Sequence, residues 1–294
     1  MTARDILAAL LVVTLWGLNF VAVKTALHVM PPFLLTSVRF AGVALCLAPF
    51  FRPRREQIPA IMGIALVLGC GHFGLLFFGL SGMDAATAAI VTQLGVPFSA
   101  LLAWLAFGER LSRSRALGMV MAFGGVALLA GEPSLPRALP LVVAVLAMLA
   151  WAASNVQVKR LGAIRPLVLN GWMALFAAPM LLVLSLGTET GQGAALVTAM
   201  GDWPTLASLG YTIIASSLVA YSLWYRLLAR HSMNQIVPFT LLGPVIGVAS
   251  GVMLLGEPLS WQKLVGGAIT IAGVAVVQLI GGVQPPADEP EPGS

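Results

Sequence analysis

The chain has 294 residues, of which 59% are hydrophobic and 9% are charged, and its formal net charge is +5. A soluble domain carries about 25% charged residues because water must solvate its surface, so this composition excludes a soluble globule. The basic residues form short clusters between apolar runs, a pattern typical of membrane-topology signals and not of a nucleic-acid-binding patch. The sequence therefore predicts a protein embedded in a lipid bilayer, with no nucleic-acid partner.

Ten apolar runs follow one another along the chain, and each is long enough to cross a bilayer as a helix, which takes about 20 residues. Proline pairs, charged clusters and glycine-rich stretches separate them. These runs predict an all-α polytopic membrane protein with ten transmembrane helices. The predicted spans cover roughly residues 5–27, 33–51, 58–80, 85–107, 114–131, 138–158, 166–187, 204–226, 233–255 and 263–283.

The basic residues also predict the orientation of the chain. Cytoplasmic loops of membrane proteins are enriched in Lys and Arg, and most of the 16 basic residues lie on one side if both termini are cytoplasmic. The predicted outer loop at 188–203 contains none. The predicted inner residues are Arg4, Arg52, Arg54, Arg55, Arg110, Arg113, Arg115, Lys159, Arg160, Arg165, Arg226 and Arg230.

Two pieces of sequence recur, which predicts an internal duplication. The stretch Gly-Glu-Arg-Leu-Ser at 108–112 matches Gly-Glu-Pro-Leu-Ser at 256–260, and a Trp precedes a Lys by eight residues both at Trp16 and at Trp151. The predicted copies are residues 1–131 and 138–283, followed by a disordered, acidic, Pro-rich tail at 284–294. Because five helices is an odd number, the second copy must be inverted, an arrangement found in many secondary transporters.

The repeated Gly-Glu-x-Leu-Ser stretch also predicts local structure. Ser112 and Ser260 are placed to cap the helices that follow them, and the preceding Glu109 and Glu257 are predicted to be structural. Their negative charge would complement a helix N-terminus. The alternative is a role for the two glutamates in gating.

Two prolines lie at matching positions in the fourth and ninth spans. Pro97 and Pro244 lack the amides that would bond the carbonyls of Gln93 and Thr240. A freed carbonyl in hydrocarbon is costly unless protein or a wet cavity satisfies it. Paired breaks predict a central cavity between the two repeats, although two ordinary kinks are the alternative.

Other polar and aromatic side chains lie at similar depth, where such groups indicate function. Interfacial anchoring and helix–helix hydrogen bonds are the alternatives. Arg39 has two possible roles: its side chain could snorkel to the interface, or it could contact a substrate carboxylate in the cavity. The predicted path residues, besides those at the two breaks, are Trp16, Asn19, His72, Trp151, Asn155, Tyr221 and Tyr225.

Several chemistries are not predicted. The G-x-G-x-x-G stretch at 69–74 lies inside an apolar span without a preceding strand, so a nucleotide site is not indicated. His28, His72 and His231 lie at different depths, and neither a metal site nor a catalytic constellation follows from them. No cofactor is predicted. Asp and Glu residues lie only at span ends, which predicts facilitated export or exchange with His72 as the one group that could titrate near neutral pH.

These motifs resemble a known family. The paired Gly-Glu-x-Leu-Ser stretches, the Trp/Asn pair in the first helix of each half and Arg39-Phe40 are similar to the EamA repeat of the drug/metabolite transporter superfamily, over about residues 5–283. The second half departs from this pattern because it lacks a counterpart of Arg39.

The resemblance implies a ten-helix exporter of small molecules in a bacterial inner membrane. Within the superfamily, the sequence is most similar to exporters of aromatic amino acids that also carry methyl viologen. Walls of Trp and Tyr suit a flat aromatic or cationic solute. The alternatives are an exporter of other amino acids, polar metabolites or cationic drugs, and a helix-bundle scaffold that transports nothing. A monomer is favoured.

Overall fold

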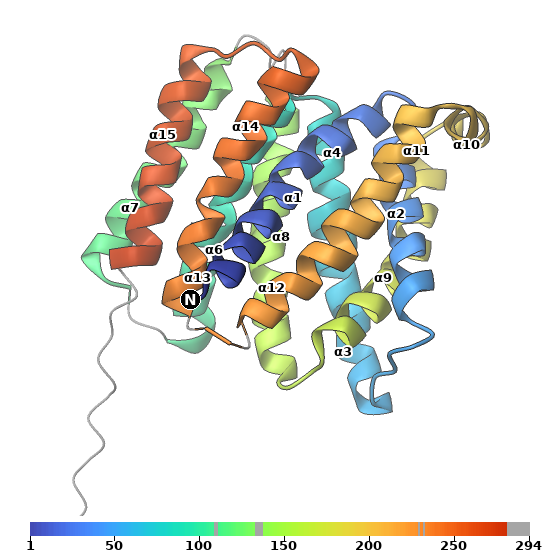
Figure 1. The fold of residues 1–294 in the computed structure, drawn as a ribbon, viewed down its shortest axis with the longest axis horizontal. Helices are drawn as coiled ribbons and strands as arrows, with labels where there is room; N and C mark the ends of the chain where they lie inside the picture. Colours follow the sequence, from blue (N-terminus) through green and yellow to red (C-terminus); the bar gives the residue numbers. More distant parts are fainter. Residues whose placement is uncertain (109–110, 133–137, 229, 232, 281–294) are drawn as a thin grey trace, which may run out of the picture.

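The computed structural model describes residues 1–280 apart from 109–110, 133–137, 229 and 232. The described residues form helices and connecting turns without strands (Figure 1). Nine of these helices are long and apolar enough to cross a membrane, and Pro32–Leu47 is a shorter apolar helix. The predicted all-α polytopic architecture is confirmed, while the predicted tail at 284–294 and Glu109 lie outside the described residues.

The elements follow one another in the order of the predicted spans. They are α1 (Ala3–Leu27), α2 (Pro32–Leu47), η1 (Arg55–Gln57), α3 (Ile58–Ile64), η2 (Ala65–Gly74), α4 (Leu75–Ser81), α5 (Ala85–Val91), η3 (Thr92–Leu94), α6 (Gly95–Phe107), α7 (Arg113–Leu128), η4 (Leu129–Gly131), α8 (Leu139–Leu161), α9 (Pro166–Thr188), α10 (Gln192–Gly201), α11 (Trp203–Gly210), η5 (Tyr211–Val219), α12 (Ala220–Leu228), α13 (Met233–Thr240), α14 (Leu242–Leu255), α15 (Trp261–Ala275) and η6 (Val276–Ile280).

The short helix α2 runs alongside α9 from one end to the other. Near the end of α2, Leu47 lies against Gly171 in the first turns of α9. At the start of α2, the backbone amide of Phe33 donates to the carboxylate of Glu189, which follows α9, at 2.7 Å. Because α9 is itself long enough to cross a membrane, its antiparallel partner α2 crosses the same layer.

Helices α7 and α15 form a tight antiparallel pair. Gly118 meets Gly273, and Gly125 meets Gly266, with backbone against backbone. The pair therefore begins at opposite ends of the molecule (Figure 1). Both predicted serine caps are confirmed, because the side chains of Ser112 and Ser260 accept from backbone amides in the first turns of α7 and α15, each at 3.2 Å.

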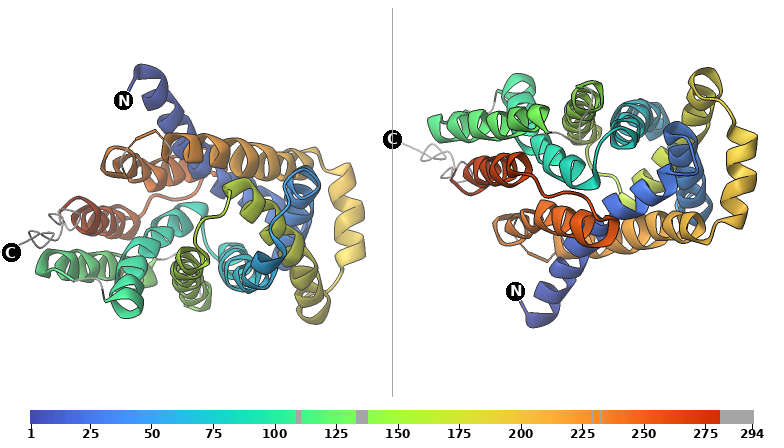
Figure 2. Two further views of the ribbon diagram at one scale, coloured as in Figure 1. Left: turned by 90° about the horizontal axis from the view of Figure 1, so that it is seen from below. Right: turned by 90° about the horizontal axis from the view of Figure 1, so that it is seen from above.

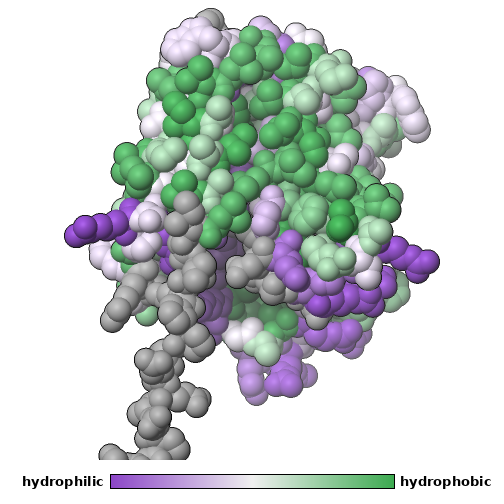
Figure 3. Space-filling view, turned by 60° about the vertical axis from the view of Figure 1, so that its left-hand side comes forward, coloured by the Kyte–Doolittle hydropathy of each residue, from purple (hydrophilic) through white to green (hydrophobic). Residues whose placement is uncertain are grey.

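The surface matches a protein that lies in a bilayer. Large apolar side chains project outward, among them Met253, Leu45 and Val183, which are 70% exposed or more. Figure 3 shows apolar side chains over most of one face and hydrophilic side chains gathered at its lower end. That end is where α8 ends and α3 begins (Figure 1), so it carries Lys159, Arg160 and the basic cluster at 52–55.

The predicted outer loop at 188–203 is in fact partly helical. It contains α10, which lies with α11 at one edge of the molecule (Figure 2). Val197 and Met200 of α10 and the following Trp203 are all more than 70% exposed. Apolar side chains on a short surface helix are typical of a segment that lies in the membrane interface.

Candidate functional site

The fourth and ninth spans are interrupted where their prolines predict. In the fourth span, α5 passes through a tight turn of 3₁₀ helix at η3 into α6. In the ninth span, α13 ends at Thr240 and α14 begins at Leu242. Pro97 and Pro244 lie just beyond these breaks, and both are buried. Gln93 and Thr240, whose carbonyls the prolines free, are half-buried.

The third and eighth spans contain wide π-helical turns, which the sequence analysis missed. They occupy η2 and η5, each preceded by one or two turns of α-helix in its own span. Turns of this kind are frequent at functional sites. In η5 the hydroxyl of Ser217 donates to the carbonyl of Thr212, five residues back, at 2.7 Å. The available sequence signals were the glycines of 69–74 in one span and the serines and threonine of η5 in the other.

Arg39 is buried in the interior of the bundle, with 2% of its surface exposed. Its guanidinium carbon lies 5.1 Å from the ring centre of Phe73 and 5.5 Å from that of Phe77. Nη2 donates to the hydroxyl of Ser217 at 3.0 Å. Its Nε and Nη1 are buried without a hydrogen-bond partner among the described residues. The snorkelling interpretation of Arg39 is therefore wrong.

An aromatic cluster lies next to this arginine. The ring centre of Trp16 lies 5.3 Å from that of Tyr221 and 5.4 Å from that of Trp224, in tilted and edge-on geometry. Tyr221 follows Ser217, the hydrogen-bond partner of Arg39, by four residues, so the two side chains share one face of this span. Trp224 was not predicted, although it stands three residues after Tyr221 and so shares its helix face.

Unpaired polar atoms also belong to this part of the bundle. The indole Nε1 of Trp16 and the side-chain oxygen of Asn19, one turn apart on α1, are buried without a hydrogen-bond partner in the part of the chain that the structure describes. Buried polar groups are nearly always paired. Two such atoms beside an aromatic cluster therefore indicate a place where a solute or water completes the bonding.

The other predicted residues with described side chains lie outside the aromatic cluster, but the ring centre of His72 lies 4.5 Å from that of Phe73, one of the rings beside Arg39. His72 is buried, and its Nδ1 lies 3.1 Å from the carbonyl oxygen of Ala147. Trp151 lies against Gly95 at the start of α6, and Asn155 is exposed, with Nδ2 3.4 Å from the hydroxyl of Ser99. The side chain of Tyr225 lies outside the described part of the chain.

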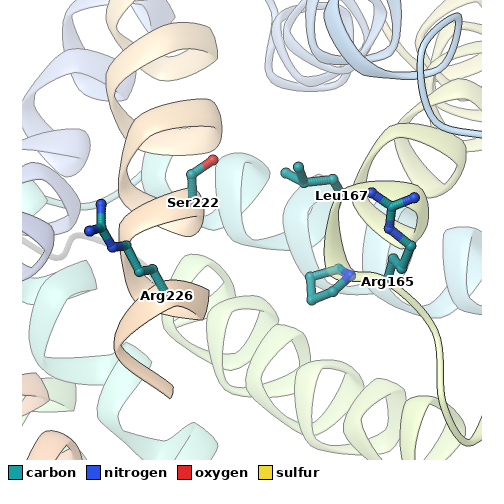
Figure 4. Close-up of a pocket in the computed structure, with 5 residues that line it drawn as sticks. Arg165, Leu167, Ser222 and Arg226 are labelled. Carbon is teal, nitrogen blue, oxygen red and sulfur yellow. The ribbon is translucent and has the colours of Figure 1, made fainter. Parts of the chain in front are cut away.

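A cavity of about 300 Å³ lies between α12 and the start of α9. Ser222 and Arg226 line it from one side, and Leu167, Pro166 and Arg165 from the other (Figure 4). Both arginines are exposed, so the cavity reaches the surface at the end that carries the basic clusters. Ser222 directly follows Tyr221 of the aromatic cluster in the chain.

The opposite end of the molecule is held together by buried polar contacts. The carboxylate of Glu257 accepts from the backbone amides of Ala85 and Ala86 at 2.6 and 2.9 Å. Lys263 is buried, and its Nζ lies 2.5 Å from the carboxylate of Asp84 and 3.5 Å from that of Glu132. Glu257 is structural, as predicted, but it caps α5 in the other half of the chain and not the helix that follows it.

Comparisons with known proteins agree with this architecture. The EamA-like transporter family matches residues 4–131 and 138–279. A relative from Salmonella typhimurium named "probable amino-acid metabolite efflux pump" is 34% identical, and the alignment covers 94% of this chain and 95% of the relative.

A relative of the same name from Escherichia coli is 33% identical over the same shares of both chains. A solved crystal structure with 20% identity superposes with a TM-score of 0.62 over 95% of this chain and 98% of the other, which shows a shared fold. The chain therefore belongs to the EamA-like transporter family, and it is a transporter and not an enzyme.

Proposed function

We propose that this small-molecule transporter exports amino acids, aromatic ones among them, from the cytoplasm across a bacterial inner membrane. The observation that carries the proposal is the aromatic cluster of Trp16, Tyr221 and Trp224 beside the buried Arg39. Aromatic rings bind flat solutes through offset and edge-on contacts. The names of two relatives, which refer to amino-acid metabolite efflux, support the same class of substrate.

Transport proceeds by alternating access of two inverted five-helix repeats around the central site. The cavity beside Arg165 and Arg226 reaches the surface at the basic end of the molecule, which the positive-inside rule assigns to the cytoplasm together with both termini. Glu257 and Lys263 join the halves at the other end. An opening at one end and polar contacts at the other are what an inward-facing state of such a transporter requires.

Counterflow in proteoliposomes tests the proposal. We expect labelled tryptophan and phenylalanine to exchange across the membrane through the wild-type protein. Trp16→Ala lowers that exchange about tenfold, since lost ring contacts and lost burial together exceed about 1.4 kcal/mol. The matched control is Trp203→Ala, which removes an exposed tryptophan from the surface and leaves exchange unchanged.

Two other outcomes would change the proposal. If aliphatic amino acids exchange as fast as aromatic ones, and Trp16→Ala affects both equally, the aromatic preference is wrong while amino-acid export stands. If no amino acid exchanges through protein that remains folded in the vesicles, the proposed function is wrong.

A further inference from the structure

Arg39 carries a buried positive charge that the described protein does not balance. None of the described Asp or Glu side chains lies within ion-pair distance of it. Three phenylalanine rings surround the guanidinium, and ring faces attract a cation but do not accept its hydrogen bonds as a carboxylate does. Ionised groups in the interior of a membrane protein are expensive and normally pair with one another or serve function. The site is therefore incomplete without an anion.

The free nitrogens of Arg39 fit a carboxylate. The nitrogens Nε and Nη1 together carry three of the five N–H groups of a guanidinium, and both are buried without a partner among the described residues. The third nitrogen, Nη2, is held by Ser217, which in turn donates to the carbonyl of Thr212. This chain of two hydrogen bonds orients the planar group and leaves the second N–H of Nη2, which together with Nε or Nη1 makes the fork-shaped pairing that carboxylates form with arginine.

The anion site and the aromatic cluster lie about one helical turn apart along the eighth span. Ser217, which holds the guanidinium, and Tyr221, which contacts Trp16, are four residues apart along the same span. Side chains at that spacing share one face of a helix, with Cβ atoms about 5–6 Å apart. In an aromatic amino acid the carboxylate and the ring are separated by two carbon atoms, which is a similar length.

We propose that Arg39 binds the carboxylate of the transported solute and thereby selects carboxylate-bearing aromatic compounds over aromatic cations. Ser217 is the positioning residue that orients the guanidinium. The same buried charge repels a cation with no compensating carboxylate, because charges interact strongly where the dielectric constant is low. Amines and dications such as methyl viologen are therefore poor substrates. This inference rests on the proposed function and specifies which end of the substrate is recognised.

Matched solutes test the inference. Counterflow in proteoliposomes compares phenylalanine, phenethylamine (the same ring and ammonium without the carboxylate), 3-phenylpropanoate (the same ring and carboxylate without the ammonium) and methyl viologen. In the wild type we expect phenylalanine to be carried at least tenfold faster than phenethylamine and methyl viologen. We expect 3-phenylpropanoate to remain measurable and to compete with phenylalanine.

Variants of Arg39 supply the second part of the test. We expect Arg39→Met to lower phenylalanine flux at least tenfold, the size of one lost charge-assisted hydrogen bond, and to leave phenethylamine flux unchanged or higher. Arg39→Lys retains part of the preference. Ser217→Ala raises the KM for phenylalanine more than it lowers kcat. Arg160→Met, which removes an exposed positive charge at the end of α8, leaves all four fluxes unchanged.

The outcomes separate this inference from the proposed function. Equal wild-type flux of phenylalanine and phenethylamine would overturn the inference and leave amino-acid export standing. An unchanged ratio of the two fluxes in Arg39→Met would also overturn it. Gel filtration and thermal unfolding show whether Arg39→Met folds. If it does not, the ratio of phenylalanine flux to phenethylamine flux is measured in Arg39→Lys and Ser217→Ala instead, and an unchanged ratio in both overturns the inference. If no compound fluxes through the wild type or raises its Tm, both proposals are wrong.

Discussion

The carboxylate of Glu257 accepts a hydrogen bond from the backbone amide of Ala85 at 2.6 Å, although the two residues are 172 positions apart in the chain. A second oxygen of the same carboxylate accepts from Ala86. The acid thus serves as the N-terminal cap of α5, where a helix presents unpaired amides and a partial positive charge. One side chain from the second half of the molecule therefore holds the start of a helix in the first half.

Removing this cap is expected to destabilise the protein. Glu257→Ala leaves two buried amides without acceptors and costs about 1–3 kcal/mol, whereas Glu257→Gln retains one acceptor oxygen and costs less. Thermal unfolding in detergent measures both. Glu56→Gln, at an exposed position, is the control and leaves the Tm unchanged. A Tm for Glu257→Ala equal to that of the wild type would contradict the capping role.

The contact between α7 and α15 predicts that Gly125 cannot be replaced without loss of stability, and the neighbouring Gly124 provides the control. A Cβ on Gly125 would collide with the backbone of Gly266 and with Thr270, whereas a Cβ on Gly124 would meet nothing within 4 Å. Gly125→Ala therefore separates the helices and costs about 1–3 kcal/mol or more. Gly124→Ala is neutral or stabilising by up to about 1 kcal/mol, because Ala favours a helix.

Unfolding of the two variants in parallel checks this prediction. Equal stabilities would show that the pair does not pack through its glycines. A loss of stability in Gly125→Ala together with unchanged transport per folded molecule would identify this pair as a static part of the structure.

Filling the cavity beside α12 is expected to block access to the central site. Ser222→Trp introduces a large side chain into a space of about 300 Å³, so we expect counterflow of phenylalanine to fall at least tenfold. Val183→Trp places the same side chain at a position that is 70% exposed on the apolar surface, and there we expect little change. Normal flux in Ser222→Trp would mean that solutes reach Arg39 by another route.

Transport is expected to follow the substrate gradient and not an imposed pH gradient. The described acidic residues lie at helix ends, where Glu189 and Glu257 cap helices and Asp84 pairs with Lys263. Among these described residues, no carboxylate lies in the middle of a span to form a relay of the kind that many proton-coupled transporters use. Uptake into vesicles with and without a pH step should therefore agree within about twofold. A large response to pH that His72→Gln abolishes would contradict this prediction.

The sequence by itself determined the local features. Hydropathy and length predicted the membrane spans, because a bilayer of fixed thickness selects apolar runs of about 20 residues. The serine caps at Ser112 and Ser260 followed from neighbouring residues. The breaks near Pro97 and Pro244 followed from the missing proline amide. Each of these features depends only on residues that are close to it in the sequence, so the sequence pattern is enough to predict it.

Only the tertiary structure decided which side chains meet. The bond from Arg39 to Ser217 joins residues 178 positions apart, and the contact of Trp16 with Tyr221 and Trp224 joins the first span to the eighth. Hydropathy says that a helix crosses the membrane but not which neighbour it has or how it is rotated about its axis. Those are set by close packing between helices, here through contacts such as Gly125 on Gly266, and so by residues far apart in the chain.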